Sequence, residues 1–139
     1  MTFNKEQDAM RYSRVSGFSL IEIMIVVAIL AIIASIALPS YNEHIRRTRR
    51  AAGAACLLQA SQQMERFYTV NLAYNAPGSP AAFTCDSDTT PFYTIAPGAV
   101  AAKTYTLNAT PIGAQAGDSC GTLSITAAGV RSPTTAGCW

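Results

Sequence analysis

Four cysteines and a single histidine are the most reactive side chains of this 139-residue chain. Zinc sites normally use close pairs such as Cys-x-x-Cys, and this sequence has none, so disulfide bonds in an oxidising compartment are the chemistry that the cysteines predict. Four cysteines allow three pairings, and spacing alone selects none of them. The residues are Cys56, Cys85, Cys120 and Cys138.

No other motif predicts catalysis. His44 lies beside a run of arginines close to a strongly apolar segment, which is a poor setting for a nucleophile–histidine pair. Asp86-Ser87-Asp88 offers carboxylates to calcium but lacks the glycine and the final glutamate of an EF-hand loop, so a solvated turn is the better interpretation. We therefore expect neither an enzyme nor a bound cofactor or metal.

The composition places these residues in a small, apolar protein. Half of the residues are hydrophobic, 13% are charged and the net charge is +2, which argues against a disordered chain and against a strongly basic nucleic-acid-binding protein. Residues 1–17 carry a net +1, residues 18–66 a net +2 and residues 67–139 a net −1. The length suits one domain.

A run of 21 residues from Phe18 to Leu38 contains one charge, Glu22. As a helix it would be about 32 Å long, enough to cross a membrane. The segment after Leu38 has no Ala-x-Ala pattern, so the run is expected to stay in the mature protein rather than leave as a signal peptide. A carboxylate in such a run has either a partner or a position near enough to the helix end to reach the headgroups.

Beyond Pro39 the helical pattern continues. Apolar or small residues follow one face, polar residues occupy the other, and one long helix bent at Pro39 is expected from about 18 to 70. Alternating residues then predict strands at 92–95, 103–110 and 121–126, with a return strand near Arg131. The expected fold class is α+β, with an antiparallel sheet on the helix. The predicted buried helical face is Ala54, Leu57, Ser61, Met64 and Tyr68.

The cluster Arg46-Arg47-Thr48-Arg49-Arg50 follows the apolar run by about two helical turns. Lipid headgroups, acidic neighbouring subunits or solvent are simpler partners for it than DNA. Taken by itself, the cluster would place the C-terminal part in the cytoplasm by the positive-inside rule, whereas the cysteines favour an oxidising compartment. Counting residues does not resolve this conflict.

The segment Ser16-Gly17-Phe18-Ser19-Leu20-Ile21-Glu22, followed by the aliphatic run, resembles the prepilin-peptidase site of type IV pilins and pseudopilins. The resemblance implies cleavage after Gly17, N-methylation of Phe18 and a role of Glu22 in assembly, where it would neutralise the Phe18 amino group of a neighbouring subunit. Pro39 matches the position of a helix-kinking proline in many members. The implied segments are the leader 1–17, the transmembrane half-helix 18–38, the amphipathic half-helix 39–70 and the periplasmic sheet 71–139.

The same resemblance implies the partners and the location. The partners would be other pilins in a bundle of N-terminal helices, the prepilin peptidase and the assembly platform of the inner membrane. The chain would begin as a single-pass inner-membrane protein with a periplasmic C-terminal domain and end in an extracellular pilus that serves adhesion, twitching motility or DNA uptake.

The C-terminal half is similar to PilE-like minor pilins, a subgroup related to the DNA-uptake pilin ComP. The segments that carry this likeness are 64–69, 118–123 and 138–139. We choose the pairing Cys120–Cys138, which would close a C-terminal loop of the kind that type IV pilins use, and Cys56–Cys85, which would tie the helix to the connector. A minor pilin is the leading prediction. A DNA-binding pilin for transformation, a major pilin and a type II secretion pseudopilin are the alternatives.

Overall fold

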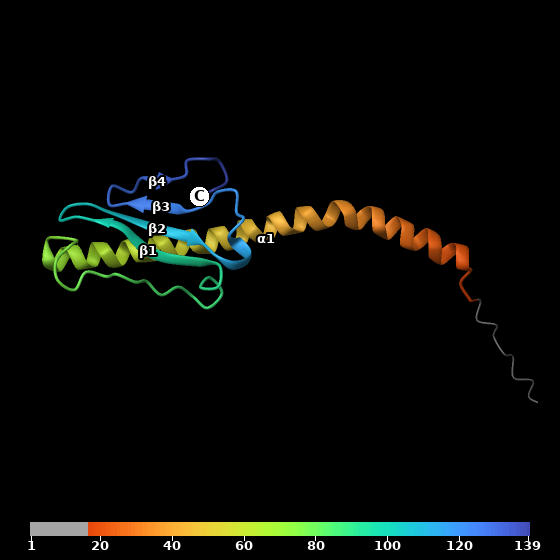
Figure 1. Ribbon diagram of the computed structural model, residues 1–139, viewed down its shortest axis with the longest axis horizontal. Coiled ribbons are helices and arrows are strands. Elements are labelled where there is room, and N and C mark those ends of the chain that lie inside the picture. The colour runs from red at the N-terminus through yellow and green to blue at the C-terminus, as the bar shows by residue number, and fades with distance from the viewer. Residues whose placement is uncertain (1–16) are drawn as a thin grey trace, which may run out of the picture. The chain divides into compact units, whose positions relative to one another are not determined.

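The computed structural model describes residues 17–139 and contains one long helix and one antiparallel sheet (Figure 1). Helix α1 runs from Leu20 to Asn71 without interruption, although it contains Pro39. The chain divides into two compact units, with the division between Leu38 and Pro39. The long helix and the α+β fold class are confirmed; of the predicted leader 1–17, all but Gly17 lies outside the described residues.

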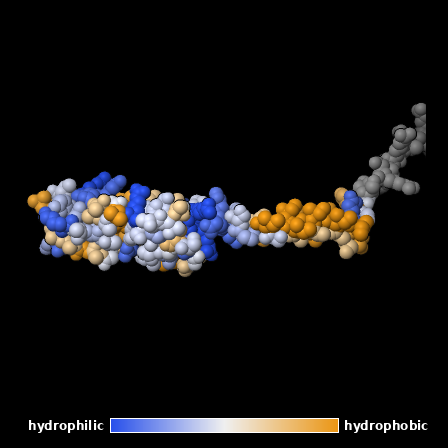
Figure 2. Space-filling view, turned by 90° about the horizontal axis from the view of Figure 1, so that it is seen from above, coloured by the Kyte–Doolittle hydropathy of each residue, from blue (hydrophilic) through white to orange (hydrophobic). Residues whose placement is uncertain are grey.

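The described part of the first unit, residues 17–38, is mostly apolar helix, and all of its residues are exposed. Its most apolar window has a mean hydropathy of 2.9 and none of it is buried. Figure 2 shows this apolar surface as a continuous band over the N-terminal part of α1. A helix that is apolar on every side and covered by nothing requires lipid or other helices around it. It is long and apolar enough to cross a membrane.

The second unit packs the rest of α1 against a four-stranded sheet with the order β1-β2-β3-β4, antiparallel throughout. Strand β2 is Tyr105–Pro111 and β3 is Leu123–Thr126, both within a few residues of the predicted positions. Strand β4, Arg131–Ser132, is the expected return strand. A short 3-10 turn, Gly113–Gln115, follows β2.

Strand β1, Tyr93–Val100, is twice as long as the sequence predicted. The predicted strand ended at Ile95, and that boundary was wrong. The register between β1 and β2 shifts between Pro97 and Ala99, so a bulge accommodates these two residues and pairing continues to Val100. Because Pro97 has no N–H to donate to a partner strand, a position beside an irregularity in an edge strand suits it.

Alternate strand residues meet one face of the helix in the core. Tyr105, Leu107 and Ala109 are at most 3% exposed, which confirms the predicted alternation in β2. On the helix, Leu57 and Met64 are fully buried, whereas the other predicted positions are only half-buried. The helix and sheet approach closely at Gly53, where a Cβ atom would lie 2.8 Å from the Tyr93 ring. The remaining buried apolar residues are Cys56, Ala60, Tyr74, Ile95, Leu123, Ile125 and Cys138.

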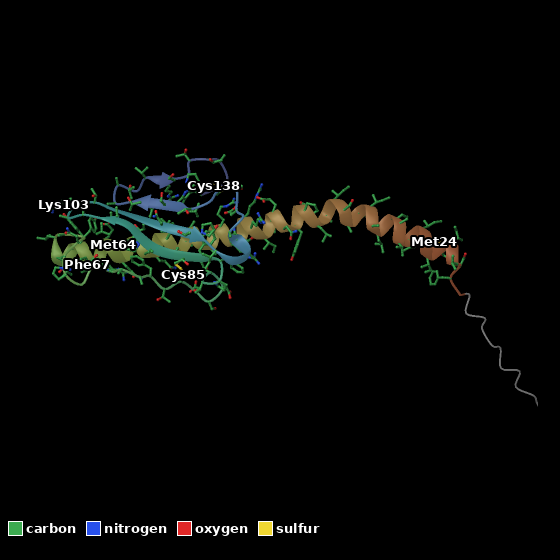
Figure 3. The ribbon with its side chains drawn as sticks, viewed as in Figure 1. Met24, Met64, Phe67, Cys85, Lys103 and Cys138 are labelled. Atoms are coloured by element: carbon green, nitrogen blue, oxygen red, sulfur yellow. A yellow bond between two sulfur atoms is a disulfide. The ribbon has the colours of Figure 1, made fainter. Side chains whose placement is uncertain are left out.

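Two disulfides fasten the segments that have little regular structure. Cys56 pairs with Cys85, which ties the connector to the helix, and Cys120 pairs with Cys138, which closes the C-terminal loop. Figure 3 labels Cys85 and Cys138 on these two segments. The pairing is the same as the one chosen from the sequence.

A cluster of tyrosines covers the C-terminal end of α1. The hydroxyls of Tyr74 and Tyr105 both donate to the Glu65 carboxylate, at 2.9–3.0 Å. Burial, followed by the hydrogen bond to Glu65, raises the pKa of Tyr74 to about 12. The Lys103 ammonium group donates to the Leu72 carbonyl at 3.0 Å, just beyond the last helical residue, and a cation there is favourable to the helix dipole.

Candidate functional site: the assembly segment and the arginine cluster

The segment that carries the predicted cleavage site lies at the start of the described chain. Gly17, Phe18 and Ser19 have no regular secondary structure and are exposed, Phe18 at 77%. The first helical hydrogen bond runs from the Ile23 N–H to the Ser19 carbonyl, at 3.2 Å, which places Ser19 at the N-cap position. The Gly17–Phe18 peptide therefore precedes the helix and is not protected by it.

Glu22 lies in the first turn of α1, and its side chain is exposed. Within residues 17–139 it has neither a hydrogen bond nor an ion pair of its side chain. A carboxylate is favourable in the first turn of a helix because the free N–H groups there carry partial positive charge. Surrounded by apolar side chains, it would still need a cation once water is removed.

The four arginines of the cluster divide into two pairs. The guanidinium of Arg47 meets the carboxylate of Glu43 at 3.3 Å on the exposed surface, and that of Arg50 forms a buried ion pair with Asp118. Neither Arg46 nor Arg49 contacts a carboxylate within the described part of the chain. Arg46 donates to the Gly117 carbonyl at 2.6 Å, and Arg49 lies 3.8 Å above the Phe92 ring.

Arg50 holds the C-terminal loop against the helix. Its Nε donates to Asp118 at 2.9 Å, one Nη donates to the other carboxylate oxygen, and the second Nη donates to the Gly137 carbonyl at 2.9 Å. Asp118 precedes the first cysteine of the loop by two residues and Gly137 directly precedes the last. One buried guanidinium thus binds both ends of the segment that the Cys120–Cys138 disulfide closes.

Two more polar side chains complete this buried network. The Tyr93 hydroxyl donates to Asp118 at 3.0 Å and accepts from the Gln115 amide at 3.3 Å, while the same amide donates to the Arg46 carbonyl at 3.0 Å. The hydrogen bond from Arg50 holds the pKa of Asp118 below its usual range, and the same bond raises the pKa of Arg50. Burial raises the pKa of Tyr93 to about 12. The pair therefore stays ionised while Tyr93 stays neutral.

The sequence interpretation of the cluster as headgroup-facing, inter-subunit or solvated was wrong for Arg50, which is 4% exposed. From the sequence no role was assigned to Asp118 or to Gln115, although both are buried and Asp118 begins one of the segments that carry the family likeness. Their partners lie 68 and 69 positions away in the sequence, so no local pattern reveals them. The one available signal was the position of Asp118 beside a cysteine of the closed loop.

The histidine and the acidic pair considered in the sequence analysis do not form a catalytic or metal site within the described residues. Among residues 17–139 no group of three or more histidine, cysteine or acidic side chains could hold a metal ion. His44, Asp86 and Asp88 are exposed, and the acidic pair lies in a turn.

Two family models match this chain. One, described as "Prokaryotic N-terminal methylation motif", matches residues 12–38, and the other, described as "Type IV minor pilin ComP, DNA uptake sequence receptor", matches residues 39–124. None of the proteins with curated descriptions matches the sequence.

Solved pilin structures share the fold. A type IV pilin from Shewanella oneidensis is 32% identical with a TM-score of 0.54, and the match covers 68% of this chain and 97% of that one. The non-core minor pilin PilV of Neisseria meningitidis is 21% identical with a TM-score of 0.51, covering 63% and 85% of the two chains, and at that identity it supports the fold alone.

The fold and the assembly segment define a type IV pilin. This chain belongs to the type IV minor pilin family whose model matches residues 39–124. As in other pilins, the methylation motif implies processing by a prepilin peptidase and assembly with other pilins, from a membrane-anchored form into a pilus. Members of this family are structural subunits.

Proposed function

We propose that this minor pilin is cut between Gly17 and Phe18, is methylated at Phe18 and enters the pilus through the helical segment 18–38. The observation that carries the proposal is the apolar half of α1, in which the most apolar window has no buried residue. Such a segment is stable only among lipids or other apolar helices. Lipid surrounds it before assembly, and the helix bundle of the filament replaces the lipid afterwards.

Glu22 supplies the charge that this bundle needs. Cleavage creates a positive α-amino group on Phe18, next to a helix end that already carries positive partial charge. Within an apolar bundle that cation and the Glu22 carboxylate are each costly alone and far less so as a pair. Since the described part of this chain gives Glu22 no side-chain partner, the Phe18 amino group of a neighbouring subunit is the partner that fits.

We further propose that the second unit is periplasmic in the membrane-anchored form. Both disulfides lie in that unit, and disulfides persist in oxidising compartments. The exposed positive charge after the apolar segment is also smaller than the sequence count suggests. Arg50 is neutralised by Asp118 and Arg47 by Glu43, which leaves two unneutralised arginines of the four.

The test is Glu22→Ala compared with Glu22→Gln and wild type in cells that produce pili. We expect all three to lose residues 1–17, and both variants to be depleted from sheared pili at least tenfold while accumulating in the membrane fraction. Removal of Glu43, whose partner Arg47 is on the surface, is the matched control and should leave incorporation unchanged. If the Glu22→Ala variant entered the pili in the same amount as wild type, the proposed role of Glu22 in assembly would be contradicted.

DNA binding is a second candidate function. The observation that favours it is the match of residues 39–124 to a family described as a DNA uptake sequence receptor. The charge is less favourable, because residues 67–139 carry a net −1 and phosphate affinity depends on clustered lysine and arginine. The exposed Arg131 guanidinium 5.2 Å above the Trp139 ring is a cation beside an aromatic surface, a combination that nucleic-acid sites use.

A mobility-shift titration with the full chain in detergent tests this candidate. At physiological salt we expect a DNA receptor to retard duplex DNA, and Arg131→Gln to weaken binding more than Arg66→Gln, which removes an equal charge from the helix surface. Absence of a shift at micromolar protein, or equal weakening by both variants, would contradict a DNA site at Arg131 and Trp139.

A further inference from the structure

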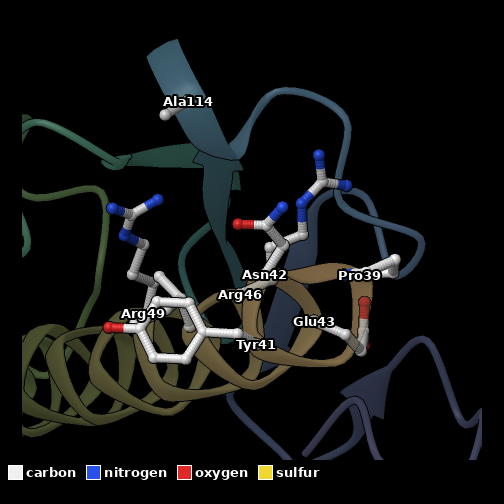
Figure 4. A pocket seen from close by; sticks show the side chains of 8 residues that line it. Pro39, Tyr41, Asn42, Glu43, Arg46, Arg49 and Ala114 are labelled. Carbon is white, nitrogen blue, oxygen red and sulfur yellow. The ribbon is translucent and has the colours of Figure 1, made fainter. Parts of the chain in front are cut away.

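A groove on the second unit lies beside the arginine cluster. It has a volume of about 630 Å³ and lies between α1 and the 3-10 turn that carries Ala114. Tyr41, Asn42, Arg46 and Arg49 line it on the helical side. Figure 4 shows the guanidinium groups of Arg46 and Arg49 on the same side of the helix.

This groove contains both arginines of the cluster that no carboxylate neutralises within the described residues. Asn42, Arg46 and Arg49 follow at spacings of four and three, so they share one helical face. Glu43 also contributes to the lining, but its carboxylate is paired with Arg47. The groove therefore has an excess of positive charge and an amide donor, which is the chemistry that binds a phosphate group.

The two cations are held in place before any ligand arrives. The hydrogen bond from Arg46 to Gly117 uses one of its five N–H groups, and Phe92 supports one face of the Arg49 guanidinium. The Gln115 amide in turn holds the backbone carbonyl of Arg46. The remaining N–H groups of Arg46 and Arg49 have no acceptor among residues 17–139, so they can bind an anion with little loss of side-chain freedom.

Position along α1 identifies the source of the phosphate. Asn42 follows the last residue of the apolar run by four residues, about 6 Å of helical rise, which is the depth of the headgroup layer. Arg46 begins about 6 Å further along, and helical side chains lean toward the N-terminus, which is the membrane side. Tyr41, 63% exposed, is at the level where aromatic residues gather in membrane proteins.

We propose that this groove binds the phosphate of an anionic lipid headgroup while the pilin is anchored in the membrane. The proposal relies on the membrane-anchored state and is independent of filament entry. In this proposal the phosphate at the membrane surface is bound by Tyr41, Asn42, Arg46 and Arg49. Arg47 and Arg50 are instead paired with carboxylates of the chain itself.

The test uses the full chain in detergent micelles with added phosphatidylglycerol, and native mass spectrometry measures retained lipid. We expect wild type to retain the lipid and the double variant Arg46→Gln/Arg49→Gln to bind about thirtyfold more weakly, from the usual contribution of two arginines at an anionic surface. Arg66→Gln/Arg131→Gln is the matched control with the same net charge, since neither residue lines the groove or pairs with a residue that does, and we expect less than a threefold change. Circular dichroism of each variant checks that the fold is intact.

A second arm replaces the lipid with glycerol phosphate, which has the same anion without acyl chains. We expect no retention of glycerol phosphate at concentrations that saturate the lipid. Equal binding of glycerol phosphate would overturn the assignment to lipid and indicate a site for free anions. Unchanged lipid retention in the double variant, or an equal loss in the control, would overturn the groove as the site.

Discussion

The two parts of α1 are continuous in backbone and opposite in environment. Before Pro39 the helix is apolar on every side and buries nothing, whereas after Pro39 it buries one face against the sheet. Each part also carries one charged residue in apolar or buried surroundings: Glu22 in the first part and Arg50 in the second. Arg50 finds its partner inside the chain, and Glu22 has none among the described residues. The second part of α1 therefore stabilises the subunit, whereas the first part leaves its apolar surface for the contacts with other subunits that we propose.

The largest effect should follow from breaking the internal ion pair. Asp118→Ala leaves the Arg50 guanidinium buried with the Gly137 carbonyl as its main acceptor, so we expect the free energy of unfolding to fall by about 3–5 kcal/mol. Denaturant titration of the full chain in detergent measures it. The double variant Arg50→Met/Asp118→Leu should recover at least half of the loss, because it leaves no unpaired charge. Failure to recover would mean that hydrogen bonds, rather than the charge, dominate.

A matched pair of leucines sharpens the contrast between the two parts. Leu57 is fully buried, and Leu57→Ala should lower the free energy of unfolding of the second unit by about 3 kcal/mol. Leu30 is 59% exposed and has no core to leave, so Leu30→Ala should change the same quantity by less than about 0.5 kcal/mol. The same titration compares them. Equal losses of stability at both positions would contradict the claim that only the part of α1 after Pro39 stabilises the subunit.

The smallest expected effect is the dependence of stability on pH. Asp118 has a lowered pKa in the folded protein, so its contribution is present above its unfolded pKa and is lost as pH falls through the folded one. The stability difference between wild type and Asp118→Asn should therefore shrink as pH falls below about 4, the unfolded pKa of an aspartate. Tyr74 and Tyr93 have pKa values raised to about 12, so their contribution is present below pH 10 and lost as pH rises toward 12. A constant difference from pH 7 to pH 2 would show that Asp118 does not titrate as described.

Much of this fold was predictable because its signals are local. The apolar run, the helical periodicity beyond it and the alternation in β2 each appear within a few turns or residues, and the structure contains all three. The length of β1 was missed because Pro97-Gly98 has the local signature of a turn, and only pairing with β2 shows that a bulge absorbs it.

The site was less predictable because its contacts are distant in sequence. The four neighbouring arginines look equivalent in the sequence. In the structure, Arg47 and Arg50 form ion pairs with Glu43 and Asp118, whereas Arg46 and Arg49 line the groove. The cleavage site at Gly17–Phe18 and the role of Glu22 were predicted from the prepilin motif. The structure shows in addition that these residues are exposed. The kink at Pro39 remains a prediction.

Assembly into the pilus as a minor subunit is tested most directly in sheared surface filaments. Quantitative mass spectrometry there measures the N-terminus of this chain and its amount relative to the other pilins. A minor pilin of this kind should appear as a small fraction of total pilin, beginning at Phe18 with one added methyl group. A chain that retains residues 1–17, or that is absent from the filaments while its processed form stays in the membrane, would contradict assembly into the pilus. A dominant signal would contradict the minor role.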